Sequence, residues 1–186
     1  MFILANNSPG IKPEPLTISI NANVIKILKN ETILVDTREQ DPLEFANTKV
    51  EKLFIGDYLM NAQEYNYTFI DRKSEGDFLG TLASGVKRFE REIQRTVELE
   101  GYLFVVIETS IDSIIDNHKK FKRKTNLEYV FHNLRDLTHK YPRRLQFIFT
   151  GSRKRSIDLI PRLLYFGKDL WQVDLQYFLD HELGNR

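Results

Sequence analysis

Two acidic side chains and a lysine lie close together in the first half of the sequence, in a spacing that favours metal-dependent hydrolysis of a phosphodiester bond. Asp71 and Lys73 are two residues apart, so both side chains leave the same face of an extended strand. Asp57 comes earlier by a segment long enough for a hairpin, which would bring all three groups to one sheet edge. The sequence therefore predicts a metal-assisted hydrolytic site at that edge.

Mg²⁺ is the predicted cofactor of this site, with Mn²⁺ as its substitute, because carboxylate oxygens are the ligands that hard divalent cations prefer. Asp57 and Asp71 would bind the metal, and the main-chain carbonyl of Arg72 would supply a third oxygen. Lys73, beside the metal, would orient the attacking water. A plain ion pair between Asp71 and Lys73 explains the same spacing without catalysis.

A second polar group follows the predicted buried strand at residues 32–35. Open α/β sheets place their sites at such strand ends. Asp36 or Glu39 would bind a second metal or its outer waters. The planar guanidinium groups of Arg38 and Arg72 would hold phosphate oxygens. The structural alternative is an ordinary turn at the end of a strand.

The elements that must position these residues alternate between strands and helices. Strands are predicted at 16–20, 23–28, 32–35, 49–55, 58–60, 67–70, 102–107 and 145–149. Helices are predicted at 74–83, 87–100, 127–141 and 158–167, with Pro161 in the first turn of the last one. Residues 111–124 read as a loop or frayed helix, and 171–177 fit a strand or a helix equally well. This order predicts an α/β fold with one mixed sheet.

Composition is typical of a globular domain, with 186 residues, 41% hydrophobic and 28% charged. The chain has no cysteine, which excludes disulfides and thiolate zinc sites. We find neither the basic start of a signal peptide nor an apolar run long enough for a membrane helix. These observations predict an intracellular protein that has no membrane partner.

Positive charge is concentrated in the second half of the chain. Residues 117–155 hold twelve Lys and Arg against two acids, whereas the rest holds 15 basic and 24 acidic residues. This asymmetry favours a polyanion such as DNA, although a solvated lysine-rich surface would explain it too. Phe121, in the basic run 119–124, could stack on an unpaired base, and the run itself could serve as a nuclear localisation signal. The predicted DNA-binding residues are Lys119, Lys120, Lys122, Arg123, Lys124, Arg153, Lys154, Arg155 and Arg88.

Three motifs in this order and spacing resemble the ERCC4 nuclease family, the nuclease module of the XPF and Mus81 proteins. They are VDTREQ at 35–40, GDY at 56–58 and DRKSEGDF at 71–78, and the resemblance covers about residues 30–165. It implies a restriction-endonuclease-like fold of the PD-(D/E)xK type and Mg²⁺-dependent cleavage of branched or flapped DNA, as in DNA repair and recombination. The residues it implies for the site are Asp36, Arg38, Asp57, Asp71, Arg72, Lys73 and Asp77, with Asp36, Asp57, Asp71 and Arg72 as metal ligands.

The sequence departs from the family pattern at two places near the site. Asp71 stands where the family usually has Glu, and Glu92 stands four residues after Arg88 where the family usually has Gln. No tandem helix-hairpin-helix pattern follows residue 165, so substrate choice would come from the basic residues, from dimerisation or from a partner. The resemblance implies a homodimer or a heterodimer with a related subunit.

We expect three parts: an extension with short strands at 1–29, the nuclease domain at 30–167 and a packed C-terminal segment at 168–186. A phage-encoded chain would work in the cytoplasm of a bacterial host, and a eukaryotic one in the nucleus. The alternative functions are a non-catalytic DNA-binding or scaffold subunit of the same fold, and a restriction or junction-resolving nuclease.

Overall fold

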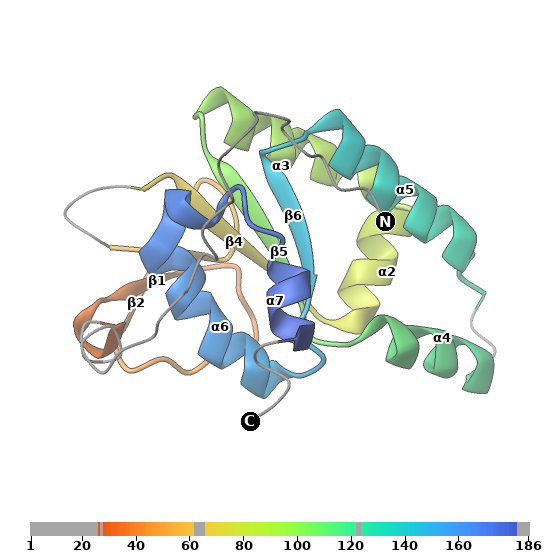
Figure 1. Cartoon of the computed structure of the whole chain (residues 1–186), viewed down its shortest axis with the longest axis horizontal. Helices are drawn as coiled ribbons and strands as arrows, with labels where there is room; N and C mark the ends of the chain where they lie inside the picture. The colour runs from red at the N-terminus through yellow and green to blue at the C-terminus, as the bar shows by residue number, and fades with distance from the viewer. Residues whose placement is uncertain (1–25, 27, 62–65, 122–123, 182–186) are drawn as a thin grey trace, which may run out of the picture.

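The apolar and β-branched runs of the sequence form six strands of one sheet (Figure 1). Their bounds are β1 (Ile33–Asp36), β2 (Thr48–Glu51), β3 (Tyr58–Met60), β4 (Thr68–Lys73), β5 (Tyr102–Ile107) and β6 (Leu145–Phe149), in the order β2-β1-β3-β4-β5-β6. The computed structural model describes residue 26 and residues 28–61, 66–121 and 124–181. The expected strand at 16–20 lies outside these residues.

The sheet is mixed, as predicted. β1 is parallel to β2 and antiparallel to β3, β3 and β4 form an antiparallel hairpin, and β4, β5 and β6 are parallel. Parallel neighbours need crossover connections. A loop without a helix connects β1 to β2, and helices supply the other two crossovers. The helical crossovers are α2 (Glu75–Ala83) with α3 (Val86–Glu98) between β4 and β5, and α4 (Ile111–Lys120) with α5 (Leu127–Lys140) between β5 and β6.

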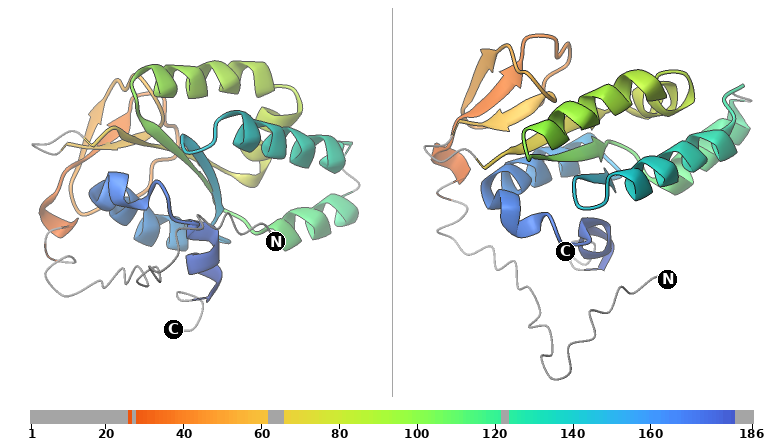
Figure 2. Two further views of the ribbon diagram at one scale, coloured as in Figure 1. Left: turned by 45° about the horizontal axis from the view of Figure 1, so that its top comes forward. Right: turned by 90° about the horizontal axis from the view of Figure 1, so that it is seen from above.

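Helices pack on both faces of the sheet and bury two hydrophobic clusters. α3 and α5 lie on one face, and α6 (Arg153–Phe166) and α7 (Leu175–His181) lie on the other (Figure 2). Phe78, Phe89 and Val130 belong to the first cluster, and Ile160 and Leu175 to the second. The sheet between them therefore has no solvated face along β5, which is buried at every residue.

β4 carries the alternation on which the site depends. Phe69 points into the cluster beneath α2 and α3, and Ile70 points into the opposite cluster beneath α6. With a side-chain period of two, Asp71 and Lys73 continue the face of Phe69. Arg72 continues the face of Ile70, so one strand supplies charged groups to both faces of the sheet at its end.

α6 corrects the prediction for the last helix. It begins at Arg153 rather than near residue 158, because Ser152 caps it by accepting a hydrogen bond from the Arg155 N–H at 3.3 Å. Pro161 therefore lies in the helix interior and not in the first turn. Its ring removes one main-chain hydrogen bond of the helix.

Four further predictions change with the structure. Residues 111–120 form a regular helix, with Ser110 as its cap. The run 49–55 is a strand only to residue 51, and the C-terminal ambiguity resolves to a helix at 175–181. In the predicted strand 23–28, the described residues 26 and 28 are helical.

Residues after 167 contact the sheet through an aromatic pair and several hydrogen bonds. The rings of Trp171 and Tyr102 stack at 5.4 Å, and Trp171 Nε1 donates to Thr68 Oγ1 at 3.0 Å. Gln146 Nε2 donates to the Val173 carbonyl at 2.9 Å. These contacts hold η1 (Gly167–Leu170) and the following turn against β4, β5 and β6.

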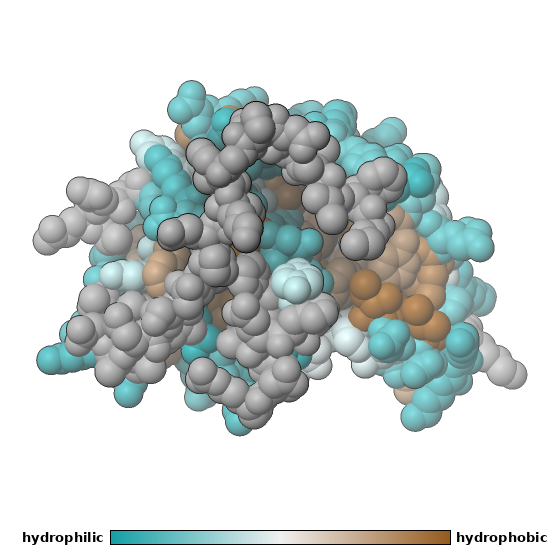
Figure 3. Space-filling model, viewed as in Figure 1, coloured by the Kyte–Doolittle hydropathy of each residue, from teal (hydrophilic) through white to brown (hydrophobic). Residues whose placement is uncertain are grey.

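Of the coloured surface in Figure 3, most is hydrophilic, with a hydrophobic area over α2 and α4. Among the residues that the structure describes, no helix has the length and apolar character needed to span a membrane.

Candidate active site

Asp71 and Lys73 lie together at the end of β4, as their spacing predicts. Lys73 Nζ donates to Asp71 Oδ1 at 3.0 Å and lies 2.8 Å from Oδ2, where the angle does not suit a second hydrogen bond. The two side chains are only 7% and 12% exposed, and Lys73 Nζ sits 5.1 Å from the centre of the Phe89 ring. The pair is thus largely shielded from bulk water.

Asp57 reaches the same region through the β3–β4 hairpin. Its N–H donates to the Ile70 carbonyl at 2.7 Å, and its Oδ2 accepts from the Arg72 N–H at 2.8 Å. Burial raises the pKa of Asp57 well above its usual value, and the neighbouring Asp71 carboxylate raises it further. Asp71 therefore lies close enough to Asp57 for its charge to disfavour the ionised form of Asp57.

The turn before Asp57 requires a glycine. Gly56 has a φ of +68°, and a Cβ atom there would lie 2.4 Å from the Ile70 carbonyl oxygen. That oxygen also accepts the Asp57 N–H, so the backbone has little room to move.

We expect Gly56→Ala to lower the free energy of unfolding by about 3 kcal/mol, from the left-handed backbone and the carbonyl clash together. Urea unfolding followed by circular dichroism measures this loss. Gly76→Ala is the matched control, because its Cβ would meet nothing closer than the Ser74 hydroxyl at 3.9 Å. Equal stability of Gly56→Ala and wild type would contradict the described turn.

Glu92 joins the acids on this face, although neither its spacing nor the three motifs identified it as a site residue. Its Oε1 accepts the Gly56 N–H at 3.0 Å. Burial and then the Asp71 carboxylate raise the pKa of Glu92. Its position on the polar face of the helix beside Arg88 and Arg95 was the signal that could have identified it. Glu92 therefore ties α3 to the turn that carries Asp57.

Arg72 occupies the opposite face of the sheet, between two carboxylates. Its Nη2 donates to Glu39 Oε1 at 2.9 Å and its Nη1 to Glu108 Oε2 at 2.9 Å. The Arg72 side chain is 9% exposed, so this guanidinium is engaged inside the protein. The structure therefore does not support the predicted contact between the Arg72 guanidinium and phosphate oxygens.

The Asp36 carboxylate does not join Asp57 and Asp71 in the structure, contrary to its predicted role as a metal ligand. Its Oδ1 accepts from the Arg38 N–H at 2.7 Å and from Arg38 Nε at 2.6 Å. Its Oδ2 accepts from the Leu53 N–H at 2.7 Å and from Arg38 Nη2 at 3.1 Å. Both oxygens are fully used and the residue is 1% exposed, so Asp36 fixes the end of β1. Arg38 is correspondingly directed to Asp36, although its side chain is 65% exposed.

Asp77 lies at the start of α2 and contacts the helix cap. Ser74 Oγ donates to Asp77 Oδ2 at 2.6 Å and accepts the Asp77 N–H at 3.2 Å, a variant of the capping box predicted from the sequence. Asp77 and Arg88 line a shallow polar hollow between α2 and α3. Both are surface residues, outside the buried group of Asp57, Asp71 and Lys73.

The predicted DNA-binding residues divide into exposed and engaged side chains. Lys119, Lys120, Lys124 and Lys154 are exposed, and Lys122 and Arg123 lie outside the described residues. Two others bond within the chain. Arg153 Nη1 donates to Asp41 Oδ2 at 2.9 Å, and Arg155 Nη2 donates to the Leu179 carbonyl at 3.0 Å. The structure thus gives Arg153 and Arg155 structural contacts that charge counting did not reveal.

The carboxylate oxygens on the Asp71 face suit a divalent cation, although they do not form a complete coordination shell. Within the described part of the chain, no three His, Cys, Asp or Glu side chains are arranged to hold a metal ion. The Asp57 carboxylate accepts the N–H of the residue that follows Asp71, and Asp71 Oδ2 is buried without a hydrogen-bond donor. On the other face, Glu108 Oε1 is likewise buried and has no donor among these residues. A cation beside Asp57 and Asp71 would relieve their repulsion.

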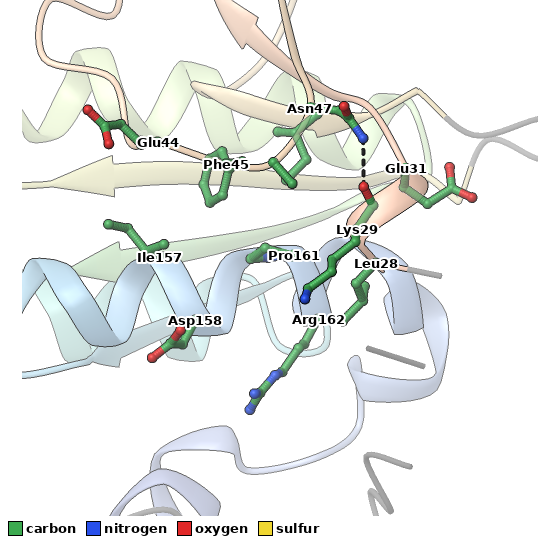
Figure 4. A pocket seen from close by; sticks show the side chains of 12 residues that line it. Leu28, Lys29, Glu31, Glu44, Phe45, Asn47, Ile157, Asp158, Pro161 and Arg162 are labelled. Carbon is green, nitrogen blue, oxygen red and sulfur yellow. Dashed lines mark hydrogen bonds between the residues drawn. The ribbon is translucent and has the colours of Figure 1, made fainter. Parts of the chain in front are cut away.

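A separate pocket lies between α6, the loop at residues 44–47 and residues 28–31 (Figure 4). Phe45, Ile157 and Pro161 line it, and Asn47 Nδ2 donates to the Lys29 carbonyl at 2.6 Å across one side. None of the predicted site residues lines this pocket. It is therefore distinct from the group of charged residues at the end of β4.

A mixed sheet with helices on both faces and Asp57, Asp71 and Lys73 at one strand end defines a restriction-endonuclease-like fold. The model of the ERCC4 domain family matches residues 35–163, and the chain belongs to this family.

Solved structures with this fold include XPF from Aeropyrum pernix. The likeness has a TM-score of 0.55 and 20% identity, over 80% of this chain and 72% of that one. A second structure, XPF from Aeropyrum pernix in complex with DNA, gives a TM-score of 0.55 and 18% identity, over 81% and 74%. At these identities the likeness shows a shared fold. The comparison with curated proteins found no match.

Proposed function

We propose that this chain is a metal-dependent endonuclease that hydrolyses phosphodiester bonds in branched or flapped DNA. The observation that carries the proposal is the convergence of Asp57, Asp71 and Lys73 at the end of the β3–β4 hairpin. Membership of the ERCC4 family supports it, as does the shared fold with an XPF structure that contains DNA.

Asp57 and Asp71 would hold Mg²⁺ or Mn²⁺, with the Arg72 carbonyl as the third candidate ligand. A bound divalent cation supplies positive charge to the phosphate and to the leaving oxygen. Asp57 is kept in place by the Arg72 N–H, and Asp71 by the strand that carries it.

Lys73 acts as a positive charge in this mechanism and not as a base. Burial works to lower the pKa of Lys73, but the charge and hydrogen bond of Asp71, together with the charges of Asp57 and Glu92, outweigh burial, so this pKa is raised. The ammonium therefore keeps its protons at neutral pH. It has three N–H donors, of which Asp71 takes one, so the others can orient a water or a phosphate oxygen.

The direct test compares cleavage in Mg²⁺ and in EDTA on linear duplex, flap, fork and four-way junction DNA. The proposal expects cuts in Mg²⁺ or Mn²⁺ on the flap or fork, and none in EDTA. Binding of all four DNAs without any cut would instead identify a non-catalytic DNA-binding subunit. Preference for the four-way junction or the linear duplex would identify a junction-resolving or restriction nuclease.

The basic run at 119–124 provides a second, binding-only prediction. Neutralising Lys119, Lys120, Lys122, Arg123 and Lys124 together should weaken DNA binding, because fewer counterions leave the DNA when fewer phosphates are neutralised. The slope of log K against log salt should flatten by about 0.9 for each phosphate that the variant no longer neutralises. Fluorescence anisotropy at several salt concentrations measures the slope.

Arg135 and Lys140 are the matched controls for this experiment. Arg135 pairs with Asp136 at 3.1 Å, and Lys140 pairs with Glu90, so their charges are already balanced. Replacing both with Ala should change the slope less than replacing two of the exposed lysines. An unchanged slope after removal of all five charges in the run 119–124 would show that DNA binds to another surface of the protein.

A further inference from the structure

An exposed aromatic ring lies three residues before Asp57, on the segment that joins β2 to β3. Phe54 is 69% exposed, whereas its neighbours Leu53 and Ile55 are 7% and 1% exposed. The flanking side chains anchor this segment in the protein and turn Phe54 outward. The Phe54 ring therefore faces the solvent and not the hydrophobic core.

The ring has a cationic neighbour from a different element. The Arg95 guanidinium carbon lies 5.8 Å from the centre of the Phe54 ring, and Arg95 is exposed in the last turn of α3. An aromatic face beside a guanidinium is suited to nucleic acid, because the ring can stack on a base while the cation meets a phosphate or stacks as well.

This pair stands next to the proposed catalytic residues. Glu92, one turn before Arg95 on α3, accepts the N–H of Gly56 at 3.0 Å. Gly56 follows Phe54 by two residues and directly precedes Asp57. Glu92 therefore joins the helix that carries Arg95 to the turn between Phe54 and Asp57. A strand whose phosphate reached Asp57 and Asp71 would pass beside Phe54.

We propose that Phe54 and Arg95 form a stacking platform for an unpaired base adjacent to the scissile phosphate. The inference deepens the proposed nuclease function and rests on it for the position of the phosphate. A base inside a duplex is stacked on both sides and has no free face to offer the ring. The platform therefore favours DNA whose strand is single where it meets the site, and it selects flaps and forks over linear duplex.

The test uses flap DNA with 2-aminopurine at successive unpaired positions, mixed with the wild-type chain in EDTA so that binding is measured without cleavage. We expect stacking on Phe54 to change the fluorescence strongly at one position next to the branch. Phe54→Ala should remove this change and weaken flap binding by about fivefold to a hundredfold, the range of one base–aromatic stack. Phe54→Trp should restore both, and binding of linear duplex should stay the same in all three.

Two controls separate this role from others. Phe54→Leu keeps an apolar side chain without a ring and should behave as Phe54→Ala. Tyr129→Ala removes another exposed aromatic, in the first turn of α5, which is not part of the proposed site, and should leave the signal near the branch unchanged. Thermal unfolding checks that each variant folds, which the exposure of Phe54 favours.

The outcomes distinguish the platform from the nuclease function. The same fluorescence change in Phe54→Ala and wild type, equal weakening of flap and duplex binding, or no flap binding at all overturns the platform. A signal that depends on Phe54, in a chain that cuts no DNA in Mg²⁺, keeps the platform and overturns the proposed activity. Cleavage of DNA in Mg²⁺, together with no effect of Phe54→Ala on the fluorescence, keeps the proposed activity and overturns the platform.

Discussion

Asp71→Asn should lower the rate of DNA cleavage by about a hundredfold to ten-thousandfold, the usual cost of losing one group that acts directly on the reacting atoms. The substitution keeps the shape of the side chain and removes the negative charge that the cation requires. Single-turnover cleavage of a flap substrate with saturating enzyme measures the chemical step without the complication of product release.

The fold should survive this substitution. Asp57, Asp71 and Glu92 share one nearby ammonium, and Asp71 raises the pKa of both other acids. Removing the charge of Asp71 relieves that repulsion, which offsets the missing ion pair with Lys73. We therefore expect a thermal midpoint in metal-free buffer close to that of the wild type.

Asp77→Asn is the matched control, since the family resemblance assigns Asp77 to the site and the structure places it on the surface at the cap of α2. We expect it to keep cleavage within several-fold of wild type and to cost about 0.5–1 kcal/mol of stability through the cap. A cleavage rate of Asp71→Asn equal to that of wild type would rule out the proposed mechanism. Loss of cleavage in Asp77→Asn equal to that in Asp71→Asn would extend the site to the helix start.

Asp36→Ala should lower the free energy of unfolding by about 3 kcal/mol, as much as Gly56→Ala. The main-chain N–H groups of Arg38 and Leu53 would lose their acceptor, and each unsatisfied donor costs about 1–3 kcal/mol. Arg38→Ala removes only the exposed side-chain contacts and should cost less than about 1 kcal/mol. Urea unfolding at about pH 7 compares the two variants with wild type.

The pH dependence of this difference has a definite sign. Burial opposes the charged form of Asp36, but the hydrogen bonds from Arg38 and Leu53 outweigh it, so the pKa lies below the usual 3.8. A lowered pKa contributes stability above the usual value, and this contribution is lost as the pH falls through the folded-state pKa. The difference in the free energy of unfolding between wild type and Asp36→Ala should be constant near neutral pH and should become smaller only below about pH 4.

Asp36→Asn separates a structural role from a catalytic one, because it retains one acceptor oxygen. At a temperature where this variant is fully folded, we expect cleavage close to wild type. Loss of cleavage in the folded variant would instead make Asp36 a metal ligand.

Local patterns were enough to predict the parts of the site that one strand or one hairpin builds. The period of two in a strand places Asp71 and Lys73 on one face, and the polar loop after Met60 predicts the hairpin that returns Asp57. Three motifs in order then predicted the fold class. These features depend on neighbours in sequence, which a single sequence displays directly.

The contacts of Arg72 and Asp36 could not be predicted in this way. Glu39 and Glu108 lie 33 and 36 residues from Arg72, and Leu53 lies 17 residues from Asp36. Only the sheet order brings these partners together, and a charged residue near a motif looks the same whether it meets solvent, a ligand or a buried partner. The start of α6 was missed for a different reason: Arg153, Lys154 and Arg155 are all charged and show no hydrophobic period, although Ser152 is a good helix cap.

The two carboxylates around Arg72 have a consequence for the energetics of metal loading. Glu39 follows β1 and Glu108 follows β5, so one guanidinium joins strands on either side of the β3–β4 hairpin. The N–H of the same residue orients the Asp57 carboxylate. The proposed metal site would therefore be preorganised: a cation would meet ligands whose conformational entropy has already been lost in folding, and it would not have to order a loop. Its affinity would then depend on charge and desolvation, with no contribution from refolding the protein.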